Sequence, residues 1–419
     1  MTRPLKLITY EMAMELVKSS LSSSRVMDER VRVDRAIGRA SAETVIAPVD
    51  VPQTERSAMD GYAILSEQTH NATVQSPARF KIAGKVLPGL KAPPLKTDEA
   101  YYVSLGSEIP QGADAVVKVE DVRVDGEYIE LRREIQRGKN VILRGEDFSK
   151  GYTIIESGQQ VTAAHAAMLI ASGINYIRAF RMPRVGILSV GDELRELDDC
   201  AEGAIVNTYR YLVADYLNGI NAVPLPMGTV KGSKDEIAQR ISEMLGDLDA
   251  VITLGGSSVG DNDNTYDGVL QCSGARAVYH GIELLPVKPT GLILIGSKPI
   301  MVLPGQAVSS TISFFLTAVP VIGMLTGMKP DSKTISAIMN DDLVNSHELD
   351  AVRLIRLVSE SNGLHAEPLK WGMNILSNLP LAGGFLRLKP REKVKRGDVV
   401  NVTVLGVHGF SNISTGMKV

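Results

Sequence analysis

Residues 185–193 read VGILSVGDE, a mostly apolar run that ends in a glycine and two acids, Asp192 and Glu193. A second apolar run, AVITL at 250–254, ends in a pair of glycines. Short apolar runs that alternate with helical patterns and stop at glycine turns are typical of buried strands in a parallel sheet. We therefore expect residues 183–329 to form a three-layer α/β domain.

The segments on either side of this domain have different patterns. Residues 51–139 carry short alternating runs broken by Pro and Gly, which predicts a β-rich lobe. Residues 1–50 and 140–182 contain helical patterns that Thr9 and Thr162 can cap, and we expect them to pack together as one discontinuous helical domain. Only strand patterns recur over 330–419, which predicts a small C-terminal β-barrel. The predicted fold class is multidomain α/β plus β.

Composition excludes several classes of protein. The chain has 419 residues and a formal charge of −3, which argues against a generic basic surface for nucleic acid. Its two cysteines, Cys200 and Cys272, exclude a disulfide scaffold and fit a reducing, cytoplasmic location. No apolar run approaches the ~18 residues of a membrane span, so we expect no membrane association.

Three glycine-rich turns are expected to follow strands of the α/β domain, at 189–193, 254–263 and 303–306. Ligands of open α/β sheets bind beyond the carboxyl ends of the strands. The middle turn combines backbone N–H groups and serine hydroxyls, which suit an anion, with Asp261 and Asp263, which suit Mg²⁺. The alternative is that these two acids only cap the next helix.

Other candidate residues also carry two interpretations. Asp192 and Glu193 are either a solvated pair or ligands at the crevice that Asp263 would share. Lys288 is either a surface lysine or a point charge that holds a phosphate or oxyanion. The loop that contains Asp60 is either a charged turn or a donor to a site made elsewhere in the assembly.

Six short motifs occur in order along the chain. They are SAMDGYA at 57–63, RGED at 144–147, SVGDE at 189–193, GGSSVGDND at 255–263, KP at 288–289 and LPG at 303–305. In this combination and order they resemble the molybdopterin molybdenumtransferase family, which includes the gephyrin E domain. The resemblance runs over essentially the whole chain.

The resemblance implies an activity and an assembly. The activity would be Mg²⁺-dependent insertion of molybdate, or of tungstate, into adenylylated molybdopterin with release of AMP. The assembly would be an elongated homodimer, held by the helical domain, with composite active sites. Because the β-rich lobe is an outlying insert, we expect the loop with Asp60 to reach the sheet of the other subunit. A molybdopterin-adenylylating protein and recipient molybdo- or tungstoenzymes would be partners, but not nucleic acid or a membrane.

The matching motifs also imply roles for single residues. Catalytic roles fall on Asp60, Asp147, Glu193, Asp263 and Lys288. Metal binding falls on Asp192, Glu193 and Asp263. Substrate contacts fall on Ser57, Gly255, Gly256, Ser258, Gly260, Pro304, Gly305 and Arg353.

The sequence departs from the usual text of this family at Glu55, where an Asp is common and the charge is kept, and in three further places. These are residues 290–292, 306–307 and 232–233, which we interpret as changes around the anion pocket. They keep open a second function, that of a non-catalytic dimeric protein that binds molybdopterin or acts as a scaffold. A hydrolase on the same sheet is a third hypothesis, but no hydrolase motif accompanies it.

Overall fold

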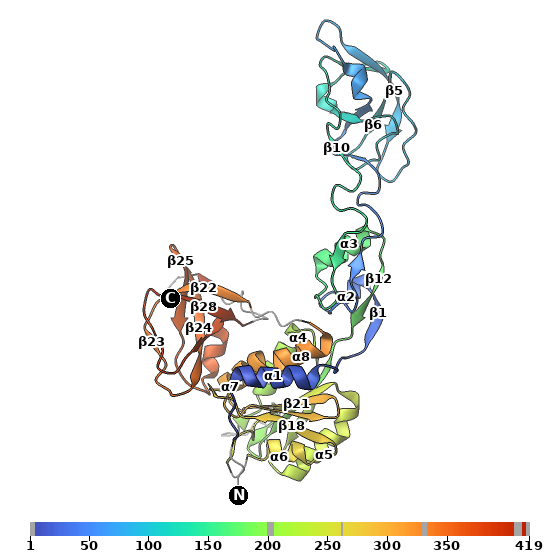
Figure 1. Ribbon diagram of the computed structural model, residues 1–419. Coiled ribbons are helices and arrows are strands. Elements are labelled where there is room, and N and C mark those ends of the chain that lie inside the picture. Colours follow the sequence, from blue (N-terminus) through green and yellow to red (C-terminus); the bar gives the residue numbers. More distant parts are fainter. Residues whose placement is uncertain (1–4, 199–204, 261–262, 329–332, 406–412, 416–419) are drawn as a thin grey trace.

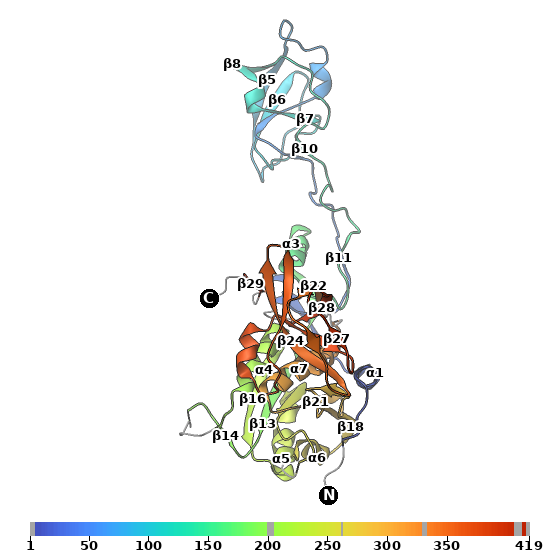
Figure 2. The ribbon, with the colours of Figure 1, turned by 90° about the vertical axis from the view of Figure 1, so that its left-hand side faces the viewer.

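The computed structural model describes the chain in five stretches, residues 5–198, 205–260, 263–328, 333–405 and 413–415. The molecule is elongated (Figures 1 and 2). The β-rich lobe stands at one end, a small helical and strand unit follows, and the α/β domain and the C-terminal barrel lie side by side at the other end.

The α/β domain contains a six-stranded sheet with the order β16-β13-β17-β21-β20-β18. Its strands are β13 (Arg184–Val190), β16 (Val223–Val230), β17 (Ala250–Leu254), β18 (Ala275–His280), β20 (Gly291–Ile295) and β21 (Lys298–Leu303). Only β20 runs against the other five, so the prediction of a mostly parallel sheet is confirmed. Helices cover both faces and are α4 (Tyr209–Gly219), α5 (Lys234–Met244), α6 (Thr265–Leu270), α7 (Ala307–Ser313) and α8 (Val319–Thr326).

Helices α7 and α8 are joined by the π-helical turn Phe314–Ala318 into one helix of 20 residues, Ala307–Thr326. This helix is long and apolar enough to cross a membrane, so our expectation that no apolar run approaches this length is wrong. The helix nevertheless lies in the core of the α/β domain, where 72% of its most apolar window is buried. A core helix and a membrane span share this composition, and burial distinguishes them.

The first helix, α1 (Tyr10–Leu21), packs elsewhere than expected. Thr9 caps it as predicted, because its hydroxyl accepts a hydrogen bond from the N–H of Met12 at 3.2 Å. The buried stripe of α1, however, joins the core that covers one face of the α/β sheet and contacts α8 and β18, rather than α3 (Ala163–Ala171). The apolar face of α1 therefore completes the cover of the sheet.

The rest of the discontinuous unit agrees with the prediction that distant segments share a core. Strand β1 (Asp28–Arg32) pairs antiparallel with β12 (Tyr176–Phe180), and helix α2 (Val33–Ala36) contacts α3. Strand β2 (Val45–Ile46) pairs with β11 (Thr153–Ile155). One buried cluster runs through both segments, so the chain leaves this unit for the lobe and returns to it.

The lobe contains a second six-stranded sheet, of order β7-β4-β6-β5-β9-β8. Its strands are β4 (Gly61–Ile64), β5 (Ala78–Val86), β6 (Glu99–Val103), β7 (Ala115–Lys118), β8 (Arg123–Asp125) and β9 (Tyr128–Leu131), with short 3₁₀ turns at Ser66–Thr69 and Val119–Asp121. At its base β3 (Arg56–Ser57) pairs antiparallel with β10 (Val141–Ile142), which ties the entry and exit of the lobe together.

The C-terminal region forms the predicted barrel. Its closed circuit runs β24-β25-β22-β28-β26 and returns to β24. These strands are β22 (Thr334–Met339), β24 (Asp350–Glu360), β25 (Gly363–Pro368), β26 (Gly384–Leu388) and β28 (Val399–Val404), accompanied by the pair β23 (Leu343–Val344) and β27 (Lys393–Val394), the 3₁₀ turn Leu376–Leu381 and the short β29 (Ile413–Thr415). Strand β19 (Leu284–Leu285), from the α/β domain, pairs in parallel with β24 and joins the two domains.

Candidate active site

The three glycine turns meet at one edge of the α/β sheet. They follow β13, β17 and β21, which are neighbouring parallel strands. The N–H of Gly255 donates to the carbonyl of Leu303 at 3.2 Å, and a Cβ on Gly305 would lie 2.9 Å from the Cα of Gly255. Such an approach needs residues without side chains. The predicted convergence of the turns is thus present in the structure.

The middle turn is held by its own side chains. Gly255 and Gly256 both have positive φ, +100° and +57°. The buried hydroxyl of Thr265 donates to the carbonyl of Gly255 at 2.7 Å, and the N–H of Gly260 donates to Oδ2 of Asp263 at 2.8 Å. Asp263 therefore closes the turn from within, whereas the N-cap of α6 is Asn264, whose side chain makes no capping bond. One such bond does not exhaust a carboxylate, which has about four lone-pair sites.

The predicted metal ligands lie on two of these turns. Glu193 is exposed, and its carboxylate lies over Gly191. Asp192 accepts a hydrogen bond from the N–H of Gly232 at 2.8 Å, which favours a role in holding the loop. No group of three His, Cys, Asp or Glu side chains gathers within the described stretches, and Asp261 lies outside them. The oxygen donors suit Mg²⁺, which commonly uses one or two carboxylates and completes its shell with substrate phosphates and water.

Lys288 lies in the loop between β19 and β20. The loop is closed by the N–H of Ile282, which donates to the carbonyl of Lys288 at 2.9 Å, and by the N–H of Gly281, which donates to Thr290 at the same distance. Lys288 is half-buried, and the described residues include no ion-pair partner for it. Because β20 runs against β21, this loop enters the sheet at the edge where the glycine turns lie. The placement agrees better with a pocket lysine than with a freely exposed one.

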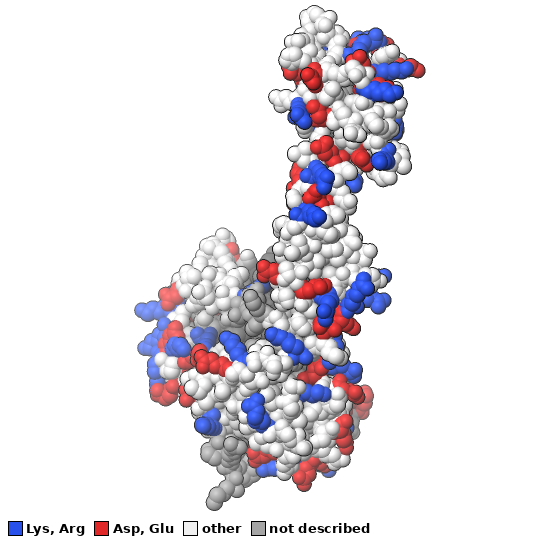
Figure 3. Space-filling view, turned by 45° about the vertical axis from the view of Figure 1, so that its right-hand side comes forward, with Lys and Arg blue, Asp and Glu red and all other residues white. Residues whose placement is uncertain are grey.

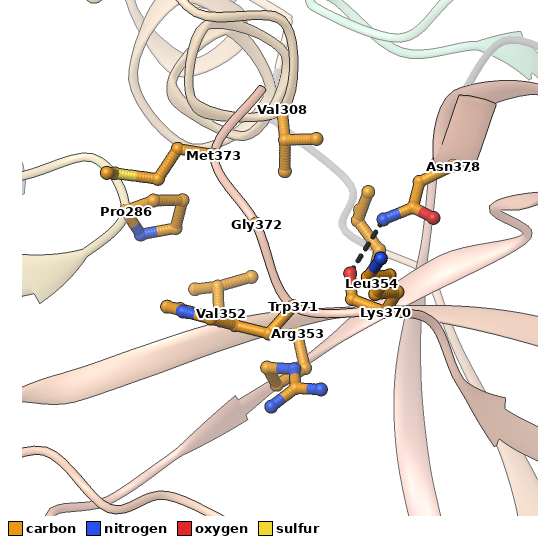
Figure 4. A pocket seen from close by; sticks show the side chains of 10 residues that line it. All are labelled: Pro286, Val308, Val352, Arg353, Leu354, Lys370, Trp371, Gly372, Met373 and Asn378. Atoms are coloured by element: carbon orange, nitrogen blue, oxygen red, sulfur yellow. Dashed lines mark hydrogen bonds between the residues drawn. The ribbon is translucent and has the colours of Figure 1, made fainter. Parts of the chain in front are cut away.

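Arg353 lies on β24, in a narrow cleft between the barrel and the α/β domain (Figure 4). Its guanidinium is 5.0 Å from the ring centre of Trp371 and donates to the carbonyl of Leu369 at 3.2 Å. Burial lowers the pKa of Arg353 from its usual value. The cleft also includes Pro286, two residues before Lys288. A second cleft of about 200 Å³ shares Arg353 and Trp371 with it.

The loops of the lobe do not reach these turns within one chain. Asp60, between β3 and β4, is exposed and accepts a hydrogen bond from the N–H of Leu105 at 2.9 Å. Ser57 is fully buried, and its hydroxyl donates to the carbonyl of Met59 at 2.5 Å, so it shapes the loop. Its predicted contact with substrate stays a prediction. Asp147 is exposed beside the base of the lobe. In both views the lobe stands well away from the α/β sheet (Figures 1 and 2).

Comparison with known proteins assigns the chain to a family. Residues 8–173 match the model "MoeA N-terminal region (domain I and II)", and residues 186–323 match "Probable molybdopterin binding domain". A molybdopterin molybdenumtransferase from Nostoc sp. is 31% identical over 298 residues, which cover 70% of this chain and 68% of the relative. The chain belongs to the molybdopterin molybdenumtransferase family. It is thus a member of an enzyme family of molybdenum cofactor biosynthesis, and the resemblance of its motifs is confirmed.

Two further relatives cover nearly the whole chain. The molybdopterin molybdenumtransferase of Haemophilus influenzae is 29% identical over 381 residues, or 89% of this chain and 93% of that one. The solved molybdopterin biosynthesis MoeA protein of Pyrococcus horikoshii has a TM-score of 0.80 and 28% identity, and it covers 96% of this chain and 99% of its own. The structural match therefore extends over nearly the whole length of both chains.

Some of the positions that depart from the family's usual text are buried, whereas Ser233 is exposed and Gly232 is partly exposed. Thr290 and Leu292 are fully buried, and the hydroxyl of Thr290 donates to the carbonyl of Val287 at 2.7 Å. Ala307 is also buried, whereas Gln306 is exposed. Thr290 and Leu292 therefore do not offer their side chains to solvent, and the interpretation that residues 290–292 alter the anion pocket stays a prediction.

A buried polar network beside the first turn was missed by the sequence analysis. Oδ1 of Asn207, which is 3% exposed, accepts from the hydroxyl of Ser189, and its Nδ2 donates to the hydroxyl of Thr229, both at 3.1 Å. Thr229 donates in turn to Glu196 at 2.8 Å. The strands β14 (Leu194–Arg195) and β15 (Ile205–Val206) pair within the same loop. The side-chain amide of Asn207, a residue outside the six motifs, thus helps to hold the loop that contains Glu193.

Charge on the visible surface is mixed. Basic and acidic side chains are interspersed over the face shown in Figure 3, and neither sign forms a continuous field there. This distribution accords with the net charge of −3.

Proposed function

We propose that the chain catalyses Mg²⁺-dependent insertion of molybdate, or tungstate, into adenylylated molybdopterin and releases AMP. The observation that carries the proposal is the meeting of three glycine turns at one sheet edge, with Glu193 and Asp263 on two of them and Lys288 in the loop that enters the same edge. Family membership supports the same reaction, since several relatives are named for it.

The turn residues would bind the anions. Adenylylated molybdopterin and molybdate are both negatively charged, and Lys288 would hold one of them as a point charge. The N–H groups of Ser258 and Val259 have no hydrogen-bond partner among the described residues and would contribute further donors. Preorganised donors of this kind stabilise charge without reorganisation at the moment of reaction. Gly255, Gly256, Gly260 and Gly305 would give the substrate close access to the backbone.

Glu193 and Asp263 would hold the magnesium ion together with substrate oxygens. Bound Mg²⁺ would polarise the pyrophosphate link of the adenylylated substrate and offset its charge. The oxyanion and the dithiolene sulfurs react with each other, so the protein needs no nucleophile. Arg353, beside the loop of Lys288, would offer a second cation to the substrate from the barrel side.

The active unit would be a homodimer with composite sites. Exposed apolar side chains of the discontinuous unit support association through this unit, and they are Ile37, Ile46, Tyr152, Ile170 and Tyr176, each about half exposed. Because the lobe stands away from its own sheet, Asp60 and Asp147 would serve the site of the other subunit. The adenylylating protein and the recipient enzymes would be transient partners of this dimer.

A direct assay tests the activity. Purified protein is mixed with adenylylated molybdopterin, Mg²⁺ and molybdate or tungstate, and AMP and the metal-loaded cofactor are measured. We expect AMP and cofactor to form in equal amounts with at least one oxyanion. Tight binding of the pterin without AMP release with either oxyanion would instead support the non-catalytic binding or scaffold function.

A further inference from the structure

His280 lies at the carboxyl end of β18, at the sheet edge that carries the glycine turns. Its Nε2 is 2.9 Å from the carbonyl oxygen of Ser257, in the middle turn. A carbonyl oxygen only accepts, so Nε2 carries the hydrogen and donates it. The side chain of an outer strand is therefore bonded to the backbone of the turn that follows β17.

The ring of His280 is fixed by stacking. It lies on the ring of Tyr266 with centroids 3.8 Å apart and planes 5° apart. Tyr266 is 3% exposed and belongs to α6, which begins directly after the turn. Gly291 makes room for the pair, because a Cβ there would lie 2.8 Å from Tyr266 and 3.3 Å from His280.

The bond to Ser257 determines the direction of the next N–H group. In a trans peptide the carbonyl and the following N–H lie in one plane and point in opposite directions. When His280 holds the Ser257 carbonyl on its own side, the N–H of Ser258 must point to the opposite side. Ser258 is an exposed residue, and its N–H has no hydrogen-bond partner among the described residues, so it remains available to a ligand.

His280 also connects the turn to the loop of Lys288. The next residue, Gly281, donates its N–H to the carbonyl of Thr290 at 2.9 Å and so closes the base of that loop. The N-terminal segment adds a bridge between Lys6 and His280 on the outer side. One residue thus lies between the two groups that would bind the anionic substrate.

We infer that His280 is a positioning residue: it holds the Ser257 carbonyl and thereby orients the Ser258 N–H as an anion donor in register with Lys288. The anion in question is the adenylylated pterin, so this role rests on the proposed function. His280 does not touch the substrate. It acts through the peptide unit between Ser257 and Ser258.

The hydrogen bond between His280 and the Ser257 carbonyl can be tested without measuring activity. Hydrogen exchange is followed in peptides that span 255–268 in full-length wild type, His280→Ala, His280→Gln and a control, His70→Ala. His280→Ala should accelerate exchange in the turn about tenfold or more, because one hydrogen bond and the stacking are lost. His280→Gln retains an N–H donor at a similar reach and should stay close to wild type, as should His70→Ala, which changes an exposed histidine of the lobe.

Binding and turnover then test the positioning role. We expect His280→Ala to raise the KM and the Kd of adenylylated molybdopterin about tenfold, with a smaller change in kcat, and His280→Gln to restore most of the affinity. An unchanged exchange rate in the turn, or a His280→Gln variant as weak as His280→Ala, would overturn the inference. If wild type binds the pterin but releases no AMP, the proposed function fails, while the exchange and Kd measurements still decide the role of His280.

Discussion

Gly255 packs so closely on Val190 that a Cβ at Gly255 would lie 2.4 Å from the carbonyl oxygen of Val190. The contact joins the turn after β17 to the end of β13. Backbone atoms cannot move aside as a flexible side chain can, so this position excludes every residue except glycine. Because Gly255 has no side chain, the two turns that carry Glu193 and Asp263 can pack directly against each other.

Gly255→Ala should therefore destabilise the α/β domain by roughly 2–3 kcal/mol, because it combines a backbone clash with an unfavourable positive φ. Gly296→Ala is the matched control, since Gly296 also has positive φ but no atom within 4 Å of its Cβ position. It should cost only about 1 kcal/mol. Thermal unfolding followed by calorimetry measures both, and equal losses would show that the contact with Val190 is unimportant.

The carboxylates of Glu193 and Asp263 should be essential for AMP release. Glu193→Gln and Asp263→Asn should each lower the rate by at least about a hundredfold, because an amide is a poor ligand for Mg²⁺. Both variants should keep the fold, since the amide oxygen introduced by Asp263→Asn still accepts from the Gly260 N–H and Glu193 is exposed. If a variant folds normally, as judged by circular dichroism, and turns over at the wild-type rate, the acid that it replaces does not belong to the site.

Loss of the lysine should affect binding more than chemistry. Lys288→Ala should raise the KM of adenylylated molybdopterin about ten- to a hundredfold, the worth of a charge-assisted contact. Lys395→Ala, at an exposed position of the barrel, provides the control. Steady-state kinetics with both variants measures the effect. Identical KM values would place Lys288 outside the site.

Stability at low pH should depend on Asp50, which anchors the loop that leads to Asp147. The N–H of Lys150 and the guanidinium of Arg144 both donate to its carboxylate, at 2.8 and 2.6 Å, and together they lower the pKa of Asp50. A carboxyl group whose pKa is lower in the folded than in the unfolded protein stabilises the fold at pH values above its unfolded pKa. This stability is lost as the pH falls through its folded pKa.

Wild type should therefore lose more stability than Asp50→Asn between about pH 6 and about pH 3, the range over which an aspartate titrates. Urea midpoints at the two pH values measure the difference. Asp247→Asn, at an exposed site without such bonds among the described residues, is the control. If Asp50→Asn retains the full acid sensitivity of wild type, the two hydrogen bonds to the Asp50 carboxylate do not contribute to stability.

Composite sites predict complementation between subunits. Asp60→Asn and Asp263→Asn homodimers should each be inactive, but a mixed dimer would contain one site with both defects and one with neither. With half of the dimers mixed after statistical exchange, activity should recover to ~25% of wild type. Native mass spectrometry verifies the exchange. Background activity in a verified mixture would mean that the two residues do not belong to different subunits of one site.

The sequence by itself determined the features that depend on residues close together in the chain. Strand runs and glycine turns predicted the parallel sheet, and the caps at Thr9 and Thr162 were correct because a cap satisfies N–H groups two or three residues away. The order of six motifs was sufficient to indicate the family, since each motif is a local string. The candidate acids and Lys288 also came from such strings.

Only the tertiary structure decided how these parts meet. Helix α1 packs on the sheet, Thr290 lies in the core, and His280 reaches Ser257 from a different strand. These facts depend on contacts between residues far apart in the chain, which periodicity and propensity do not specify. An apolar helix such as Ala307–Thr326 has the same sequence pattern in a core and in a membrane, and its burial is a property of the folded chain.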